Sequence, residues 1–112
     1  MYYYGGRLFR PISSEGESDT TSETIFKYKQ KDDLLTGTYA GGSVRFGQLI
    51  GTVNMAGRID MRYHHMTVEG ELVFGVCKSI PEEMENGKLR LHERWQWMSG
   101  DKSKGRTTLE EI

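Results

Sequence analysis

Hydrophobic and polar residues alternate along much of the chain, and this pattern predicts β-strands because successive side chains of a strand point to opposite faces. The clearest example is the segment KLRLHERWQWM at residues 88–98. Its more apolar face carries Leu89, Leu91, Glu93, Trp95 and Trp97. Its polar face carries Arg90, His92, Arg94 and Gln96. The segment therefore predicts a strand that contains both tryptophans of the chain and a carboxylate, Glu93, on its apolar face.

Seven further strands are predicted from the same alternation, at residues 7–12, 23–30, 34–40, 43–53, 58–68, 71–79 and 106–112. We expect Pro11 to end the first of them, because proline removes a backbone donor. The polar residues 13–22 and the proline-containing residues 80–87 are predicted loops. No segment predicts a convincing helix. The three tyrosines at residues 2–4 favour packing at one end of a β-structure over stacking on a ligand.

Eight consecutive strands joined mainly by short turns predict an all-β protein with a single antiparallel up-and-down barrel, similar to a lipocalin, and one domain over residues 1–112. Closing a sheet into a barrel removes its unpaired edges. Glycines inside the predicted strands, at Gly47, Gly51 and Gly75, permit the bends that closure requires. A two-sheet sandwich is the main alternative.

The more apolar face of each strand predicts which side chains point into the barrel: Phe26, Tyr28, Ile59, Met61, Tyr63, His65, Leu72, Phe74, Val76, Leu91, Glu93 and Trp95. A shift of one residue would reverse the faces of any strand. A largely apolar pocket with a few polar groups is typical of a small-molecule site. The predicted ligand-binding residues are therefore Tyr28, Tyr63, His65, Glu93 and Trp95. In the alternative interpretation, Glu93 pairs with His65 or an arginine, fixes the strand register and binds nothing.

Composition and charge narrow the classes of function. The chain has 112 residues, with 15 basic and 16 acidic residues and a formal charge of -1, so no overall field favours nucleic acid or an anionic membrane. Cys77 is the only cysteine, which rules out an internal disulfide and favours a reducing compartment. The first ten residues, MYYYGGRLFR, contain no long apolar run. We therefore expect no signal peptide, no transmembrane helix and a cytoplasmic location.

Neither a metal site nor a reactive cysteine is predicted. His64 and His65 are adjacent, so on a strand they point to opposite faces and cannot bind one metal together. A zinc site would need His64, His92 and Asp60 on the outer face, and no spacing requires it, so we expect no metal or other cofactor. Cys77 could be a nucleophile beside a histidine, but the surrounding sequence carries no such signature and favours a small buried hydrophobic residue.

Three blocks of sequence carry a resemblance to a known family: residues 49–65 (LIGTVNMAGRIDMRYHH), residues 70–101 and the closing LEEI. They are similar to a small bacterial family of uncharacterised single-domain proteins, and the segments IDMRYHH and LHERWQW are its most specific part. The resemblance covers nearly the whole chain and implies no established activity, cofactor or site. At the level of the fold, the predicted barrel is also similar to the lipocalin-like (calycin) barrels, which identifies no ligand.

Some members of that family are labelled N-acetylglutamate synthase, and the residues argue against this activity here. Acetyltransferases of that kind hold the pyrophosphate of coenzyme A at the N-terminus of a helix. The nearest segment is QLIGTV at residues 48–53. It is followed by a predicted turn and another strand, so it offers no such helix.

Three hypotheses of function follow from the sequence. The first is a barrel that binds a small, partly apolar molecule between the residues predicted above. The second is a small enzyme that uses Glu93 or His65 for proton transfer. The third is a protein whose outer face contacts another protein or a second copy of the chain, through Arg62, His64, His92 and Arg94.

Overall fold

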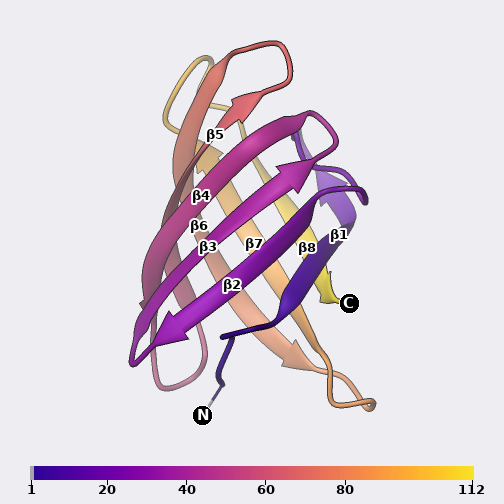
Figure 1. Ribbon diagram of the computed structural model, residues 1–112, viewed down its shortest axis with the longest axis vertical. Coiled ribbons are helices and arrows are strands. Elements are labelled where there is room, and N and C mark those ends of the chain that lie inside the picture. The colour runs from indigo at the N-terminus through magenta and orange to yellow at the C-terminus, as the bar shows by residue number, and fades with distance from the viewer. Residues whose placement is uncertain (1) are drawn as a thin grey trace.

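The computed structural model describes residues 2–112, which form eight β-strands and no helix. The strands are β1 (Leu8–Glu15), β2 (Ile25–Lys31), β3 (Leu34–Gly41), β4 (Val44–Val53), β5 (Ile59–Thr67), β6 (Leu72–Glu83), β7 (Leu89–Trp97) and β8 (Lys104–Glu111). Each pairs in antiparallel fashion with the next, and β8 pairs with β1 to close a barrel (Figure 1). The predicted up-and-down barrel is confirmed, and the sandwich alternative is wrong. Within residues 2–112, no helix that could cross a membrane is present.

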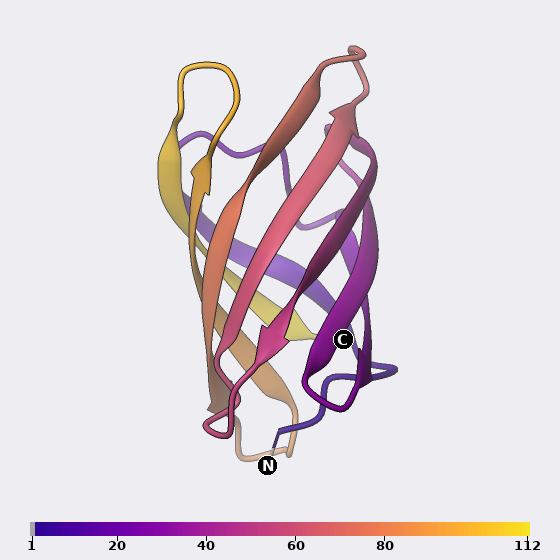
Figure 2. The same ribbon diagram turned by 90° about the vertical axis from the view of Figure 1, so that its left-hand side faces the viewer.

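The two ends of the barrel differ (Figures 1 and 2). We call the end with residues 2–7 and the turn at residues 54–58 the lower end, and the end with residues 16–24 and 98–103 the upper end. Strands β1 and β2 share only two register pairs, Leu8 with Lys27 and Phe9 with Phe26, near the lower end. Above Phe9, β1 therefore has only β8 as a neighbour, and residues 16–24 span the space between β1 and β2.

Both prolines lie inside strands, which corrects the predicted loops at residues 13–22 and 80–87. Strand β1 continues through Pro11 to Glu15, with a register shift between Pro11 and Ser13. Strand β6 continues through Pro81, which pairs with Leu91, to Glu83. The pairing of β1 with β2 ends at Phe9, and that of β6 with β5 ends at Ser79. Each proline therefore lies where its strand has one neighbour, so its missing donor can face the unpaired side.

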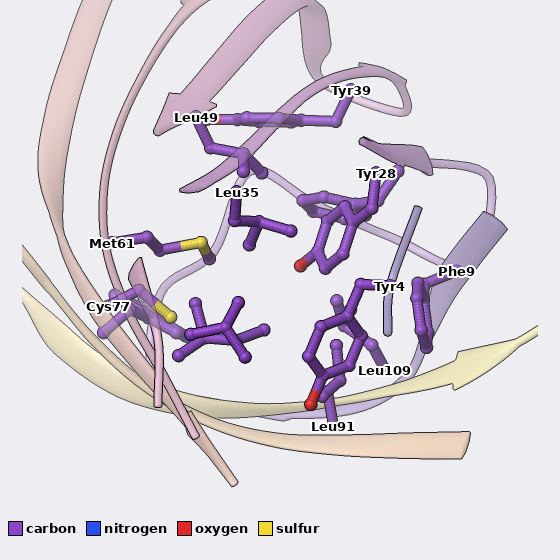
Figure 3. Packing of buried hydrophobic residues seen from close by; sticks show 14 of the residues in the cluster. Tyr4, Phe9, Tyr28, Leu35, Tyr39, Leu49, Met61, Cys77, Leu91 and Leu109 are labelled. Atoms are coloured by element: carbon purple, nitrogen blue, oxygen red, sulfur yellow. The ribbon is translucent and has the colours of Figure 1, made fainter. Parts of the chain in front are cut away.

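The lower half of the barrel is filled with apolar side chains and closed by the N-terminal segment. Figure 3 shows Tyr4, Phe9, Leu91 and Leu109 together in this part of the core, and each is fully buried. The Tyr4 hydroxyl donates to the Gly57 carbonyl at 2.5 Å, and the Tyr4 ring stacks on Tyr2. The predicted packing of the N-terminal tyrosines at a barrel end is thus confirmed for Tyr2 and Tyr4, whereas Tyr3 is exposed.

Strand β6 presents the opposite face to the one predicted. Leu72 and Phe74 are exposed and Val76 is half-buried, whereas the inward positions hold Val73, Gly75, Cys77 and Ser79. The reason lies in the neighbouring strands, because Gly75 is paired with Tyr63 on β5 and with Trp97 on β7. Small residues on β6 leave room inside the barrel for these large rings.

Glycine opposite a ring recurs around the upper half of the barrel. Gly47 is paired with Tyr39, and Gly105 is paired with Trp95. A Cβ atom added to Gly75 would lie 2.6 Å from the Tyr63 hydroxyl oxygen and would also contact the Gln96 carbonyl. The interior volume of this closed barrel is therefore divided between ring-bearing residues and the glycines that accommodate them.

We predict that Gly75→Ala lowers the free energy of unfolding by about 1–3 kcal/mol, the usual cost of overpacking a filled interior. The added methyl group must displace either the Tyr63 ring or the backbone of β7. Chemical denaturation followed by circular dichroism measures the change. Lys78→Ala, at an outward position of the same strand, is the control and should stay within about 0.5 kcal/mol of the wild type. Equal stability of the two variants would show that the ring can move at no cost.

Candidate functional site

A small cavity lies in the upper half of the barrel, beneath residues 18–20. Its volume is about 50 Å³, enough for a few water molecules at about 10–15 Å³ each. It is lined by side chains of the loop and of the seven strands β2 to β8: Ser18, Asp19, Thr20, Phe26, Tyr39, Leu49, Met61, Tyr63, His65, Cys77, Glu93, Trp95, Trp97 and Thr107. The cavity therefore matches a small molecule or the polar head of a larger one.

Aromatic rings line this cavity in pairs. Phe26 and Tyr39 stack with their centroids 4.7 Å apart. The rings of Trp95 and Trp97 lie 6.0 Å apart at an angle of 29°. Tyr63 lies parallel to His65, with centroids 6.3 Å apart. Flat apolar surfaces therefore face the cavity from β2, β3, β5 and β7.

Glu93 is the buried carboxylate of the site, with a relative exposure of 6%. Its Oε2 atom accepts a hydrogen bond from the Ser79 hydroxyl at 2.9 Å, and no lysine or arginine among residues 2–112 forms an ion pair with it. Burial raises the pKa of Glu93 to about 7, against the opposing effect of the bond from Ser79. The hypothesis that Glu93 pairs with His65 or an arginine is wrong.

Tyr28 has the one buried side-chain polar atom in the described part of the chain that lacks a hydrogen-bond partner, its hydroxyl oxygen. Figure 3 shows this hydroxyl pointing toward the middle of the barrel. Burial, and secondarily the charge of Glu93, raises the pKa of Tyr28 well above its ordinary value. At neutral pH the group is therefore a protonated phenol that can donate or accept one hydrogen bond.

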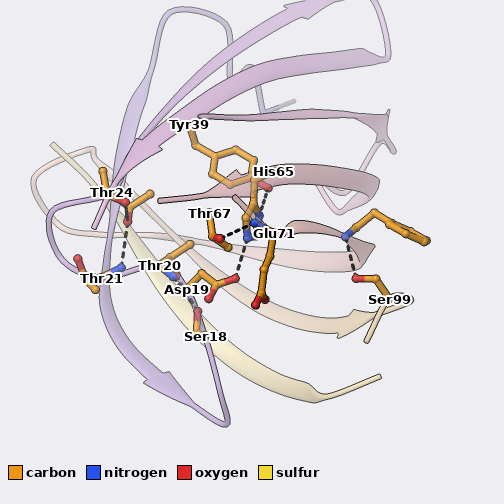
Figure 4. Close-up of polar contacts among 12 residues, drawn as sticks. Ser18, Asp19, Thr20, Thr21, Thr24, Tyr39, His65, Thr67, Glu71 and Ser99 are labelled. Carbon is orange, nitrogen blue, oxygen red and sulfur yellow. Dashed lines mark hydrogen bonds and ion pairs between the residues drawn. The ribbon is translucent and has the colours of Figure 1, made fainter. Parts of the chain in front are cut away.

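His65 joins the loop above the cavity to the barrel (Figure 4). Its Nε2 atom lies 2.8 Å from Asp19 Oδ2, and its Nδ1 atom lies 2.8 Å from the Tyr39 hydroxyl oxygen. Because a carboxylate only accepts, Nε2–H donates to Asp19, and in a neutral ring Nδ1 accepts from Tyr39. The Asp19–His65–Tyr39 chain thus connects residues 16–24 to β5 and β3.

All five residues predicted to bind a ligand point into the barrel. Tyr63, His65, Glu93 and Trp95 line the cavity itself, and Tyr28 is buried in the core next to it. The Trp95 indole nitrogen donates to the Thr107 hydroxyl at 2.9 Å, which holds the indole ring in place. Glu93 and His65, paired in one hypothesis, bond instead to Ser79 and to Asp19.

The sequence did not identify several members of the site. Asp19 lies in a polar loop without periodicity, and only the tertiary structure places it over the cavity. Ser79 was missed because the predicted face of β6 was reversed, and Cys77 was expected to be a buried residue but not a member of the pocket. Thr107 is paired with Glu93 in the register of β7 and β8, so a correct prediction of that register would have placed Thr107 in the site.

The remaining candidate residues do not form a chemical centre. Cys77 is buried, and burial raises the pKa of its thiol well above the ordinary value, with a further contribution from Glu93. This is the opposite of the lowered pKa that activates a thiol nucleophile. No group of three potential metal ligands occurs within residues 2–112.

The polar residues of the outer face bond separately to close neighbours. His64 and His65 lie on opposite faces, as predicted. His64 is hydrogen bonded to Gln48, His92 to Glu82 and Arg62 to Asp60. His64, His92 and Asp60 therefore each have a partner outside the zinc set considered from the sequence.

We predict that Tyr28→Phe stabilises the protein by about 1 kcal/mol, because it removes a buried hydroxyl group without a partner. For a domain of this length the melting temperature should rise by about 4–8 °C. Tyr4→Phe is the matched control, since its hydroxyl donates to Gly57 and its loss should destabilise by a similar amount. A lower melting temperature for Tyr28→Phe would mean that the hydroxyl is already satisfied.

We predict that Glu93 makes the protein less stable as the pH rises from about 4.5 to about 7. Its pKa in the folded state, about 7, lies above the ordinary value of 4.5, so the folded state binds more protons than the unfolded state in this range. The loss of unfolding free energy due to Glu93 is absent below pH 4.5 and complete above pH 7, where it reaches about 3 kcal/mol.

The measurement is urea denaturation of the wild type and Glu93→Gln between pH 4.5 and pH 8. The difference in unfolding free energy between the two proteins isolates the contribution of this carboxylate from those of other groups. Glu85→Gln, at an exposed position in the turn between β6 and β7, is the control and should follow the wild type. Parallel pH profiles for the wild type and Glu93→Gln would contradict the prediction.

Comparison with known proteins agrees with this architecture. The family model described as avidin-like protein matches residues 2–112. No curated protein and no solved structure matches the chain.

Proposed function

Because the chain belongs to the avidin-like protein family, we propose that it binds a small, partly apolar molecule inside the upper half of the barrel. The observation that carries this proposal is the cavity itself, which combines paired aromatic rings with a buried carboxylate. The unpartnered hydroxyl of Tyr28 lies in the core beside it. The lower half of the same barrel is filled with apolar side chains. Polar groups with unused hydrogen-bonding capacity thus gather at one place, as in small-molecule sites.

Each predicted ligand-binding residue has a role in this proposal. Trp95 and Tyr63 provide flat apolar surfaces, and Glu93 and Tyr28 provide polar contacts that orient the bound molecule. His65 acts through the loop, because its bond to Asp19 holds residues 16–24 over the cavity. Entry of a ligand takes place at the upper end, where β1 and β2 are unpaired.

Acid–base catalysis by Glu93 is the second candidate function, favoured by its pKa of about 7, which is suited to proton transfer at neutral pH. Glu93 and His65 have separate hydrogen-bond partners, so they do not act as a directly bonded pair. Binding without chemistry therefore needs fewer assumptions and is the function we favour.

Tryptophan fluorescence tests the proposal, because both tryptophans of the chain line the cavity. We predict that a screen of small amines, amino acids, carboxylic acids, sugars and biotin gives at least one saturable fluorescence change. A ligand present at about 100 times its dissociation constant should also add about 2.7 kcal/mol to stability, visible as a higher melting temperature.

Two variants locate any binding. Cys77→Met places extra volume in the cavity and should abolish the fluorescence change, whereas Phe46→Leu, on the outer face, should leave it intact. Circular dichroism establishes that both variants are folded. A screen without a saturable change, or binding unaffected by Cys77→Met, would refute a binding site in the barrel.

A further inference from the structure

The charge of the cavity indicates the kind of molecule that it accepts. Two carboxylates, Glu93 and Asp19, are among its lining residues, and none of the lining residues is lysine or arginine. Asp19 has His65 as its partner. Glu93 has only neutral hydrogen-bond donors, of which Ser79 is the one within 3 Å. Glu93 is therefore the one carboxylate of the lining whose side chain has neither a cation nor an imidazole as its partner.

An ionised carboxylate without a cationic partner is costly in a protein interior. The structure offers no internal compensation, because the described arginine side chains that form ion pairs, Arg7, Arg62 and Arg90, pair with Glu111, Asp60 and Glu110. A positively charged ligand would supply the missing partner. An anionic ligand would face Glu93 and Asp19 with no compensating cation in the lining.

The aromatic rings of the cavity favour the same charge. The faces of tryptophan and tyrosine rings attract cations, and a combination of several rings with a carboxylate is the usual way in which proteins bind organic ammonium ions. Here Trp95, Trp97, Tyr39 and Tyr63 line one small cavity together with Glu93. The ring faces and the carboxylate of Glu93 would therefore contact the same bound cation.

A second observation concerns the core beside the cavity, which also contains a polar group without a hydrogen-bond partner. Tyr28 is 1% exposed, and its hydroxyl has no partner among residues 2–112. The hydroxyl points toward the interior of the barrel (Figure 3). It is the kind of group that a bound molecule with a hydrogen-bonding substituent would satisfy.

We propose that the ligand is a small organic cation of the ammonium class, neutralised by Glu93 and enclosed by the rings of Tyr39, Tyr63, Trp95 and Trp97. The inference rests on the proposed function, since it specifies the ligand of the same cavity. The cavity volume of about 50 Å³ limits the enclosed part to a headgroup, and any longer chain would extend past residues 18–20 toward solvent.

Ionisation of Glu93 adds a pH dependence to this binding. The titratable groups around it are Tyr28, Tyr39, Tyr63, His65, Cys77 and Asp19. Burial raises the pKa of the three tyrosines and of Cys77, so these groups stay uncharged at neutral pH. Cation affinity should therefore increase from pH 6 to pH 8, as Glu93 loses its proton.

The test compares choline with 3,3-dimethylbutan-1-ol, an uncharged molecule of the same shape, by tryptophan fluorescence and calorimetry at pH 8. We predict that choline binds about tenfold more tightly or better, because only it gains from the carboxylate and the ring faces. In Glu93→Gln this preference should fall to about twofold or less. Glu82→Gln, an outer-face carboxylate change, should keep the full preference.

The outcomes separate this inference from the function on which it rests. Equal binding of the two molecules, with no effect of Glu93→Gln, would overturn the cation proposal while leaving a ligand site in the barrel. Binding of neither molecule, when another compound of the screen does bind, would also overturn it. If the whole screen gives no saturable change, the proposed function fails together with the inference.

Discussion

The pairing of β1 with β8 is the contact on which the rest of this structure depends. It runs from Phe9 opposite Glu111 to Glu15 opposite Arg106 and converts an open sheet into a closed barrel. Closure of an eight-stranded sheet fixes the space inside, which is just wide enough for side chains to fill. Several large inward rings are therefore matched by a small residue on the neighbouring strand, as Tyr63 and Trp97 are by Gly75.

The closure is complete between β8 and β1 but short between β1 and β2, and this difference locates the site. The two strands separate above Phe9, so the upper half has one unpaired side that residues 16–24 cover. A fully paired barrel end would have to break strand hydrogen bonds to admit a molecule. Here only the contacts of a loop, including the bond from His65 to Asp19, need to change.

The fold could be predicted from the sequence because each strand has one buried face, which produces alternation over its whole length. The positions of Phe26, Met61, Leu91 and Glu93 inside the barrel follow from that pattern, and the structure confirms them. The same rule failed on β6, where the outward residues are more hydrophobic than the inward ones. The large rings of β5 and β7 determine which face of β6 points inward. The sequence of β6 alone does not indicate that its inward residues must be small.

Contacts between distant segments account for the parts of the site that the sequence did not reveal. Ser79 reaches Glu93 through the register of β6 and β7, and a one-residue error in that strand moves Ser79 to the outer face. Asp19 belongs to a loop whose path depends on where β1 stops pairing with β2. A residue pattern can identify a buried carboxylate, but its partners are set by strands that are far apart in the sequence.

The interior combines well-packed apolar side chains with two polar groups that lack a partner, and this contrast is itself an argument for function. Leu35, Ile59, Leu91 and Leu109 show that this chain can fill the interior with apolar side chains in well-paired strands. The same interior nevertheless contains Glu93 without a cation and Tyr28 without a hydrogen-bond partner among residues 2–112. Apolar residues of similar size would stabilise the barrel more. Local departures from good packing that serve no structural purpose are characteristic of functional sites, and in this barrel both departures face the interior: Glu93 lines the cavity, and Tyr28 lies in the core beside it.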